Sequence, residues 1–141
     1  MPSLKKIIAT TLLLGTSLFA VDGYKVYQET CKACHVEMIS VAETMKQMKT
    51  LKAPPMVEVS NQLKRTIIIK GSKADDEEIH RFATIAFIKN YLQSPSMDYF
   101  MCNPGAVDRF GVMPAQSHLN DEERQAVAEW IYDRYEGVEF K

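Results

Sequence analysis

The chain has 141 residues, 17 lysines and arginines against 18 aspartates and glutamates, and 46% apolar residues. This length predicts one globular domain, because it suffices for a single hydrophobic core and little more. The composition excludes collagen-like, coiled-coil and wholly disordered chains, and the net charge of −1 argues against a nucleic-acid partner, which requires a basic excess.

Residues 1–20 have the features of a secretory signal peptide. Two lysines precede a mostly apolar stretch over 7–19, and the segment holds no acidic residue. This stretch is shorter than the roughly 20 residues that a membrane-spanning helix needs. We therefore expect export to the periplasm, cleavage after Ala20 or Ser17, and a soluble mature domain over 21–141. An uncleaved segment would instead tether the domain to the membrane.

A short C-x-x-C-H run follows, formed by Cys31, Cys34 and His35. This run is the attachment signature of c-type haem, because two thiols on one helical turn can reach the two vinyl groups on one side of the porphyrin. The imidazole that follows directly then faces the iron, for which it is a good ligand. We therefore predict one covalent haem c, attached through Cys31 and Cys34, with His35 as the proximal axial ligand.

Two other interpretations of the cysteine pair are open. A thiol–disulfide redox pair would be favoured by a neighbouring βαβ pattern, which the sequence lacks. Half of a zinc site would need two more ligands, and Cys102, His80 and His118 lie at no recognisable zinc spacing. Cys102 itself is expected to be a buried thiol, with an intermolecular disulfide or a redox-sensitive site as alternatives.

Three helices are predicted in the middle of the chain, over 38–48, 56–68 and 76–92, because apolar residues recur there at helical spacing. The third is the most pronounced. Its apolar stripe includes Ile79 and Phe82, and acidic residues at its start interact favourably with the helix dipole.

Three methionines of the first predicted helix, Met38, Met45 and Met48, fall on one helical face. Thioethers in an exported protein can bind Cu(I), which prefers soft sulfur ligands. Methionine more often fills irregular apolar space, and a single stripe is typical of a face turned to the core. We therefore expect these side chains to pack in the core or to line a haem pocket.

Basic residues are concentrated in the middle of the chain. Between Lys46 and Lys73 there are seven bases against the single acid Glu58, whereas residues 121–141 carry seven acids against three bases. A solvated face accounts for either stretch. The sharper hypothesis is that the basic stretch surrounds the haem edge and steers an acidic redox partner, so that association weakens as ionic strength rises. The bases are Lys46, Lys49, Lys52, Lys64, Arg65, Lys70 and Lys73.

Met113 lies in a loop that is built to aim one side chain. Gly111 permits an unusual backbone angle, and Pro114 stiffens the chain just after the sulfur. A methionine sulfur on the distal side of a haem raises its reduction potential, so we predict Met113 as the distal ligand. Arg109, beside this loop, is a candidate partner for a haem propionate. The alternatives to Met113 are Met56, which follows a diproline, His80, His118 and a vacant position.

The last predicted helix covers 120–135, with Asn120 as its N-cap and Trp130 and Ile131 on its apolar stripe. Near the other end of the chain, Gly23 and Tyr27 precede Cys31 at intervals of four, which places them on one helical face. A glycine on that face lets a second helix approach closely. Trp130 and Ile131 are its predicted neighbours.

With these motifs the sequence resembles the class I, mitochondrial-type cytochrome c family in its monohaem bacterial periplasmic form. The resemblance rests on Gly23-x-x-x-Tyr27-x-x-x-Cys31-x-x-Cys34-His35, on Gly111-Val112-Met113-Pro114, and on the closing helix with Trp130-Ile131. It implies an all-α, cytochrome c-like helical bundle wrapped around one covalently attached haem, with an extended central helical segment. It also implies that the first and last helices cross beside the haem, which His35 and Met113 ligate.

The family further implies electron transfer rather than enzymatic catalysis: one electron is carried on the haem, between redox partner proteins, by what we expect to be a monomer. The protein would act alone or as the haem subunit of a larger oxidoreductase. A haem-based small-ligand binding or sensor protein with a vacant or labile distal position is the first alternative. A haem-free thiol–disulfide redox protein using Cys31 and Cys34 is the second.

Overall fold

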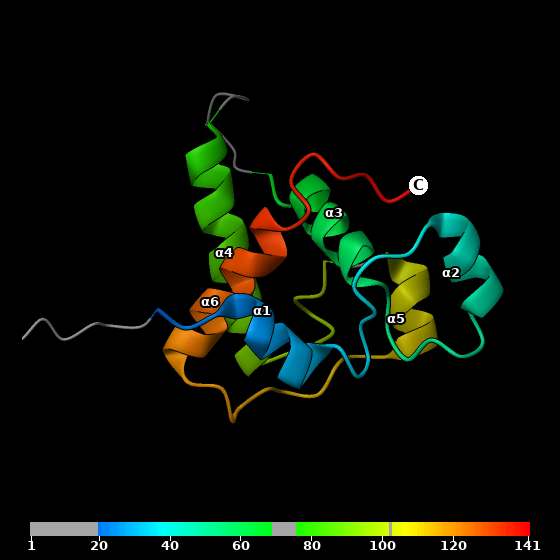
Figure 1. Ribbon diagram of the computed structural model, residues 1–141, viewed down its shortest axis with the longest axis horizontal. Helices are drawn as coiled ribbons and strands as arrows, with labels where there is room; N and C mark the ends of the chain where they lie inside the picture. The colour runs from blue at the N-terminus through cyan, green and yellow to red at the C-terminus, as the bar shows by residue number, and fades with distance from the viewer. Residues whose placement is uncertain (1–19, 69–75, 102) are drawn as a thin grey trace, which may run out of the picture.

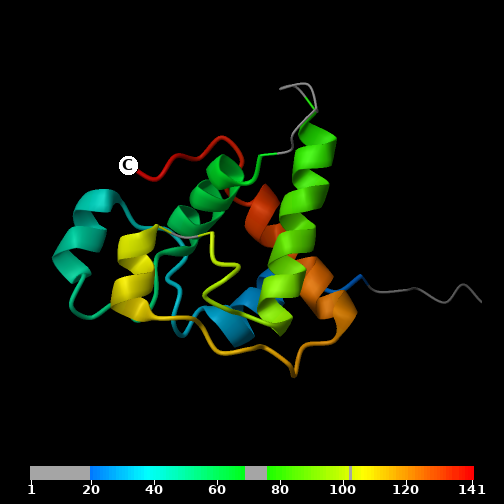
Figure 2. The same cartoon turned by 180° about the vertical axis from the view of Figure 1, so that it is seen from behind.

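The computed structural model describes residues 20–68, 76–101 and 103–141, and these residues form helices and connecting segments without a β-strand. The expectation of an all-α chain is therefore confirmed for them. The elements, shown in Figure 1 and from behind in Figure 2, are α1 (Gly23–Val26), the π-helical turn η1 (Tyr27–Cys31), α2 (Val41–Gln47), α3 (Met56–Thr66), α4 (Glu77–Gln93), α5 (Pro104–Phe110) and α6 (Asp121–Asp133).

Several sequence predictions lie outside these ranges. They concern the export segment apart from Ala20, the thiol of Cys102, and Lys70 and Lys73 of the basic stretch. Among the described helices, none is both long enough and apolar enough to span a bilayer.

The helices α3, α4 and α6 form where the apolar periodicity predicts them, and local capping explains where they begin. The Asn120 side chain accepts a hydrogen bond from the Glu123 N–H at 2.9 Å, and the Glu123 carboxylate accepts one from the Asn120 N–H. This reciprocal pair satisfies two free donors at the start of α6. At the start of α4 the Asp76 carboxylate accepts from the Ile79 N–H, a single capping bond without the reciprocal one.

Helix α5 was missed by the periodicity analysis because it has only seven residues. Its signal is local instead: the Asn103 side chain accepts from the Gly105 N–H, and Pro104 stands at the first helical position. Proline suits that position because its missing N–H would have no partner there.

The prediction that the methionines of 38–48 pack in the core or line the haem pocket is wrong for Met38 and Met45, while Met48 is half-buried. Helix α2 is shorter than expected, and Thr44 is its buried residue, whereas Met38 is 45% and Met45 65% exposed. Helix α2 lies beside α5 at one end of the molecule, away from the helices that form the core (Figures 1 and 2). A helical stripe indicates a common face, but it does not state that another element covers that face.

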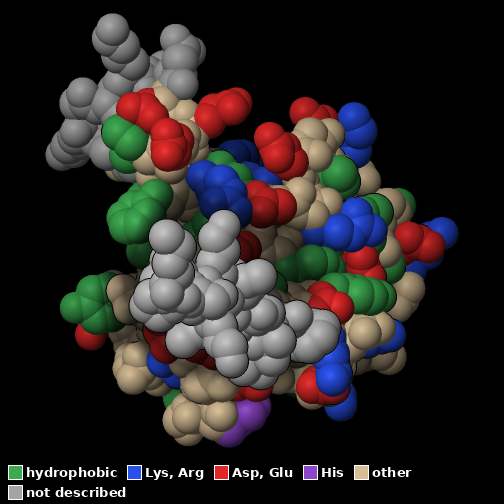
Figure 3. Space-filling model, turned by 60° about the vertical axis from the view of Figure 1, so that its left-hand side comes forward, with side chains coloured by type: hydrophobic (Ala, Val, Ile, Leu, Met, Phe, Trp, Pro, Cys, Tyr) green, Lys and Arg blue, Asp and Glu red, His purple; other side chains and the backbone are tan. Residues whose placement is uncertain are grey.

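Helix α4 buries one face and leaves two predicted apolar positions outside it. Thr84, Ile85, Ile88 and Leu92 are buried, but Ile79 is 43% and Phe82 74% exposed. Figure 3, with the α4 side turned forward, shows hydrophobic side chains at the surface among charged ones. The covered stripe of α4 is thus narrower than the apolar stripe of its sequence.

The first and last helices cross at Gly23, as its position in the sequence predicts. A Cβ atom added there would collide with the Ala126 carbonyl group and would lie 2.8 Å from Trp130 Cβ. Ile131 is not among its nearest neighbours. Beyond the crossing, the buried Tyr27 ring stacks on the Trp130 indole with ring centroids 4.5 Å apart. Because the Gly23 backbone lies this close to the Ala126 carbonyl group, only glycine fits at position 23.

Replacing Gly23 by alanine is expected to lower the free energy of unfolding by about 3 kcal/mol, the upper end of the cost of overpacking, because the obstructing atoms belong to the backbone. Gly105→Ala is the matched control, since its new methyl group would meet only Asn103 Oδ1 at 3.4 Å. We expect this control to be neutral or stabilising by up to about 1 kcal/mol, as alanine favours helix. Urea unfolding followed by circular dichroism measures both, and equal stabilities would contradict the crossing.

Candidate functional site

The cysteine motif follows the first helix through a tight turn. Asp22 caps α1, the chain widens into the π-helical turn η1, and the Cys31 carbonyl then accepts from the N–H groups of Cys34 at 3.1 Å and His35 at 2.9 Å. Single π-helical turns are rare in proteins overall, and those that occur are frequently found at functional sites. The turn wraps the motif around the end of one helix. Its two thiols and its imidazole thereby line the same cavity.

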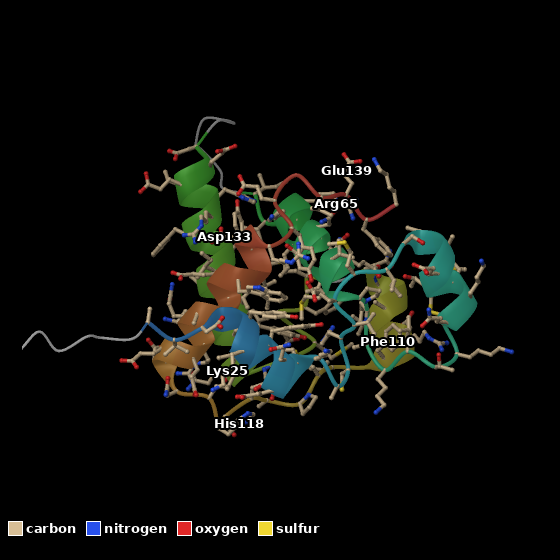
Figure 4. All side chains as sticks on the ribbon, viewed as in Figure 1. Lys25, Arg65, Phe110, His118, Asp133 and Glu139 are labelled. Atoms are coloured by element: carbon tan, nitrogen blue, oxygen red, sulfur yellow. The ribbon has the colours of Figure 1, made fainter. Side chains whose placement is uncertain are left out.

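One cavity brings the predicted haem-binding residues together. Cys31, Cys34 and His35 line it, and so do the two candidate methionines, Met56 and Met113. The remaining walls come mainly from apolar and aromatic side chains of α3, α4, α5 and the segment before α5, among them Val59, Leu63, Phe87, Ile88, Leu92, Phe100, Val107 and Phe110. The labelled Phe110 belongs to α5 in Figure 4. Five candidate residues, up to 82 positions apart in the chain, thus share one apolar chamber.

The His35 ring is fixed in one tautomer. Its Nδ1 lies 2.7 Å from the Pro54 carbonyl oxygen. A carbonyl only accepts, so Nδ1 carries the proton and Nε2 keeps a free lone pair. Burial of the ring lowers the pKa of His35, while the hydrogen bond to Pro54 acts in the opposite direction. The imidazole is therefore neutral at pH 7, which is the form that ligates a metal.

Residues 35–37 are held along their backbone by long-range hydrogen bonds. The Tyr27 hydroxyl donates to the His35 carbonyl at 2.8 Å, and the Met56 N–H donates to the Val36 carbonyl at 2.7 Å. The Glu37 carbonyl accepts from the Tyr135 hydroxyl at 2.9 Å and from the Val57 N–H at 3.2 Å. The start of α3 and the hydroxyl groups of Tyr27 and Tyr135 thus hold the segment that carries His35.

The Met113 loop is anchored at both ends. Gly111 has φ +70°, a left-handed angle that favours glycine, and its N–H donates to the Val107 carbonyl at 2.8 Å. At the other end the Gln116 N–H donates to the Leu92 carbonyl at 2.7 Å, and the Gln116 side chain donates to the Pro114 carbonyl at 2.8 Å. The predicted role of Gly111 in shaping this loop is confirmed.

Other sequence candidates lie elsewhere. The two ring nitrogens of His80 contact the Tyr132 hydroxyl and the Lys64 carbonyl, each at 3.0 Å. His118 is exposed and lies at the lower edge of the molecule in Figure 4. The Arg109 guanidinium donates to the Met48 carbonyl. None of these three residues lines the cavity.

One thioether of the cavity was not singled out in the sequence, and one base of the predicted basic stretch also lines the cavity. Met101, just before α5, supplies a third thioether, and Lys52 is the cavity's lysine. A methionine without loop-stiffening neighbours carries no local signal that it will line a shared cavity. Met101 is identified only because the folded chain brings it to the same cavity as the cysteine motif.

The predicted basic stretch does not form one patch within the described residues. Lys46, Lys49 and Lys52 are exposed on and after α2. At the far end of α3 the Lys64 ammonium donates to the Tyr132 carbonyl at 2.6 Å and lies 4.4 Å from the centre of the Tyr132 ring. Arg65 donates to the Gln62 side chain. The lysines available to a partner next to the cavity are therefore those of 46–52.

The two thiols of the C-x-x-C-H run are free, and they differ in exposure. Cys31 is buried and Cys34 exposed. Burial, with a smaller contribution from Cys34, raises the pKa of the Cys31 thiol to about 11. Within 20–68, 76–101 and 103–141, no group of three or more His, Cys, Asp or Glu side chains is placed to hold a metal ion.

Comparison with known proteins identifies relatives without assigning a role. No family model matches the chain, and no solved structure matches it. A protein from Aquifex aeolicus (strain VF5), described as an uncharacterized protein, is 34% identical over 140 residues, an alignment that covers 89% of this chain and 85% of the relative. At this identity and coverage the chain belongs to the same family as the Aquifex aeolicus protein.

Proposed function

We propose that this protein is a periplasmic electron carrier of the cytochrome c type, with one haem c attached through Cys31 and Cys34 and ligated by His35 and Met113. The observation that carries the proposal is the single cavity lined by all four residues, in which the His35 ring is anchored through Nδ1 to the Pro54 carbonyl. The all-helical structure of the described residues and the crossing at Gly23 agree with a cytochrome c-like fold.

The residues of the cavity fit a haem. Two thiols stand at its edge for the vinyl groups, a neutral imidazole presents an unprotonated Nε2, and thioethers are available as a second soft ligand. The walls are apolar and aromatic, which suits a flat, largely apolar macrocycle. Lys52 offers a positive charge for a carboxylate at the cavity. When bound, the haem supplies the one-electron chemistry of its iron.

In the proposed function the protein side chains would hold the iron rather than transform a substrate. His35 would bind it through Nε2, and its hydrogen bond to Pro54 fixes the ring orientation and would raise the basicity of the ligand. Met113 would complete the coordination from the anchored loop between α5 and α6. The apolar walls would keep water away, and an iron held by both His35 and Met113 would have no site for a substrate, so the proposed role is outer-sphere electron transfer.

Hydrogen bonding favours Met113 over Met56 as the distal ligand. The Met56 N–H donates to the Val36 carbonyl, next to His35, and Pro54 two residues earlier accepts from the His35 ring. Met56 therefore begins α3 on the side of the cavity that holds the proximal histidine. Met113 comes from a separate loop that is tied to the end of α4.

An exposed surface beside the cavity supports the expectation of an acidic redox partner. Residues 38–53, which include α2, form an excursion of the chain. Its two ends are held together by the hydrogen bonds of His35 to Pro54 and of Val36 to Met56. It carries exposed Met38 and Met45 together with Lys46, Lys49 and Lys52. Its acid, Glu43, is engaged in the cap of α2. Apolar contacts within a basic rim suit a transient complex with an acidic protein.

Replacing Lys46 and Lys49 by glutamate should slow electron exchange with a reduced acidic electron-transfer protein at least tenfold at low salt, because electrostatic steering is reversed. Lys25→Glu/Arg65→Glu makes the same charge change on α1 and at the far end of α3, away from this segment, and should have a much smaller effect. The ionic-strength dependence of the rate, measured by stopped-flow, separates the two variants. Equal rates for both would contradict docking on this surface.

The visible spectrum of protein matured in a c-haem-competent periplasm tests the function. Sharp reduced bands of a low-spin c-type haem, a weak red-end ferric band of sulfur–iron ligation, and resistance of the ferrous form to CO are expected. Rapid CO binding would favour the sensor alternative instead. Protein without covalent haem would leave the thiol–disulfide alternative, although the raised pKa of Cys31 makes that thiol a poor nucleophile.

A further inference from the structure

Two buried tyrosines make the same kind of bond to neighbouring peptides. The Tyr27 hydroxyl donates to the His35 carbonyl at 2.8 Å, and the Tyr135 hydroxyl donates to the Glu37 carbonyl at 2.9 Å. Tyr27 is 0% and Tyr135 1% exposed. Burial raises the pKa of Tyr27 to about 12 and also raises that of Tyr135, so both phenols stay protonated and donate at neutral pH.

The two bonds differ in what supports them. The Glu37 carbonyl also accepts from the Val57 N–H, so it keeps a partner without Tyr135. Among the backbone bonds of the described residues, none reaches the His35 carbonyl, which accepts from the Tyr27 side chain. Removing the Tyr27 hydroxyl therefore releases the peptide that carries the imidazole, whereas removing the Tyr135 hydroxyl does not.

Tyr27 also contacts both the motif and the helix crossing. Its carbonyl accepts from the Lys32 N–H at 3.0 Å, inside the C-x-x-C-H run, and its ring stacks on Trp130 of α6. The Gly23 crossing one turn earlier brings α1 against the same helix, next to Trp130 Cβ. The packing of α1 and η1 on α6 is thus transmitted to His35 through one hydroxyl group.

We propose that Tyr27 is a positioning residue for His35: its hydroxyl holds the His35 peptide, so that the Pro54-anchored ring has one orientation. The inference rests on the proposed function, in which His35 ligates the haem iron. It assigns Tyr27 a role distinct from core packing, because the stacked ring alone would serve packing equally well.

The test compares Tyr27→Phe with Tyr135→Phe. Both variants keep their rings, and each should lower the folding equilibrium constant about fivefold, the usual effect of one lost hydrogen bond. In the ferric haem-loaded protein, we expect the electron paramagnetic resonance signal and the shifted NMR lines of the His35 ring to change or broaden in Tyr27→Phe. Both should stay as in the parent in Tyr135→Phe. Unchanged signals in Tyr27→Phe, or equal changes in both variants, would overturn the proposal.

A second measurement keeps this test separate from that of the proposed function. If the matured protein carries no haem, the proposed function fails, but the Nδ1–H proton of His35 still reports on the ring through nitrogen–proton NMR. Tyr27→Phe should speed the exchange of this proton with water more than tenfold, while Tyr135→Phe should not. Equal exchange in parent and Tyr27→Phe would show that the hydroxyl does not position the ring.

Discussion

Protein with alanine at both Cys31 and Cys34 is expected to carry no haem after denaturation, when expressed in a periplasm that matures c-type cytochromes. The two thioethers are the only covalent links that the proposal provides, and the axial bonds to His35 and Met113 do not survive unfolding. Haem-dependent peroxidase staining of a denaturing gel measures this loss. The double variant should lose about 95% or more of the parental staining, because both attachment points are removed.

The third cysteine supplies the matched control for this experiment. Cys102→Ala removes one thiol outside the C-x-x-C-H run and should retain the parental haem signal. Each single variant, Cys31→Ala or Cys34→Ala, leaves one attachment point and should stain at an intermediate level. Covalent haem in the double variant, or its loss in Cys102→Ala, would exclude the assigned attachment residues.

Met113→Leu is expected to produce the second large change. Leucine conserves volume but has no ligand atom, so the ferric red-end band should vanish and the ferrous form should bind CO. The midpoint potential should fall by about 0.1 V or more, a fraction of the roughly 0.8 V that axial ligands span. Spectra and a redox titration of the purified protein measure all three effects.

The other two cavity methionines provide the comparison. Met56→Leu and Met101→Leu remove thioethers from the same chamber, with the same change in volume. We expect both to keep the red-end band and to resist CO. Loss of the band in Met56→Leu would transfer the distal role to Met56, against its hydrogen bond to the Val36 carbonyl. Loss in Met101→Leu would point to the thioether that the sequence analysis did not consider.

The two ends of the domain were the most predictable parts. The spacing of Gly23, Tyr27 and Cys31 and the capping box at Asn120 are local patterns, and the structure confirms the close helix crossing and the start of α6. Local stereochemistry decides both. A glycine at the contact allows backbones to meet, and an Asn three residues before a Glu satisfies the first N–H groups of a helix.

The middle was predictable as helices but not as packing. Helices α3 and α4 lie where the periodicity places them, whereas the Met38 and Met45 side chains are exposed and Phe82 points away from the core. Amphipathic spacing reports which residues share a face. Whether that face is covered depends on elements distant in the chain, and α2 has few such neighbours.

By itself, the sequence determined that the described chain is helical, where its main helices begin, and which cysteines, histidine and methionines are candidates for a haem site. The tertiary structure alone decided that Pro54, 19 residues from His35, fixes the ring, and that Tyr27 holds the His35 peptide. It also revealed Met101 and Lys52 in the same cavity. Backbone propensity and capping act within a few residues, whereas these contacts join separate segments that meet only in the packed structure, which no local pattern encodes.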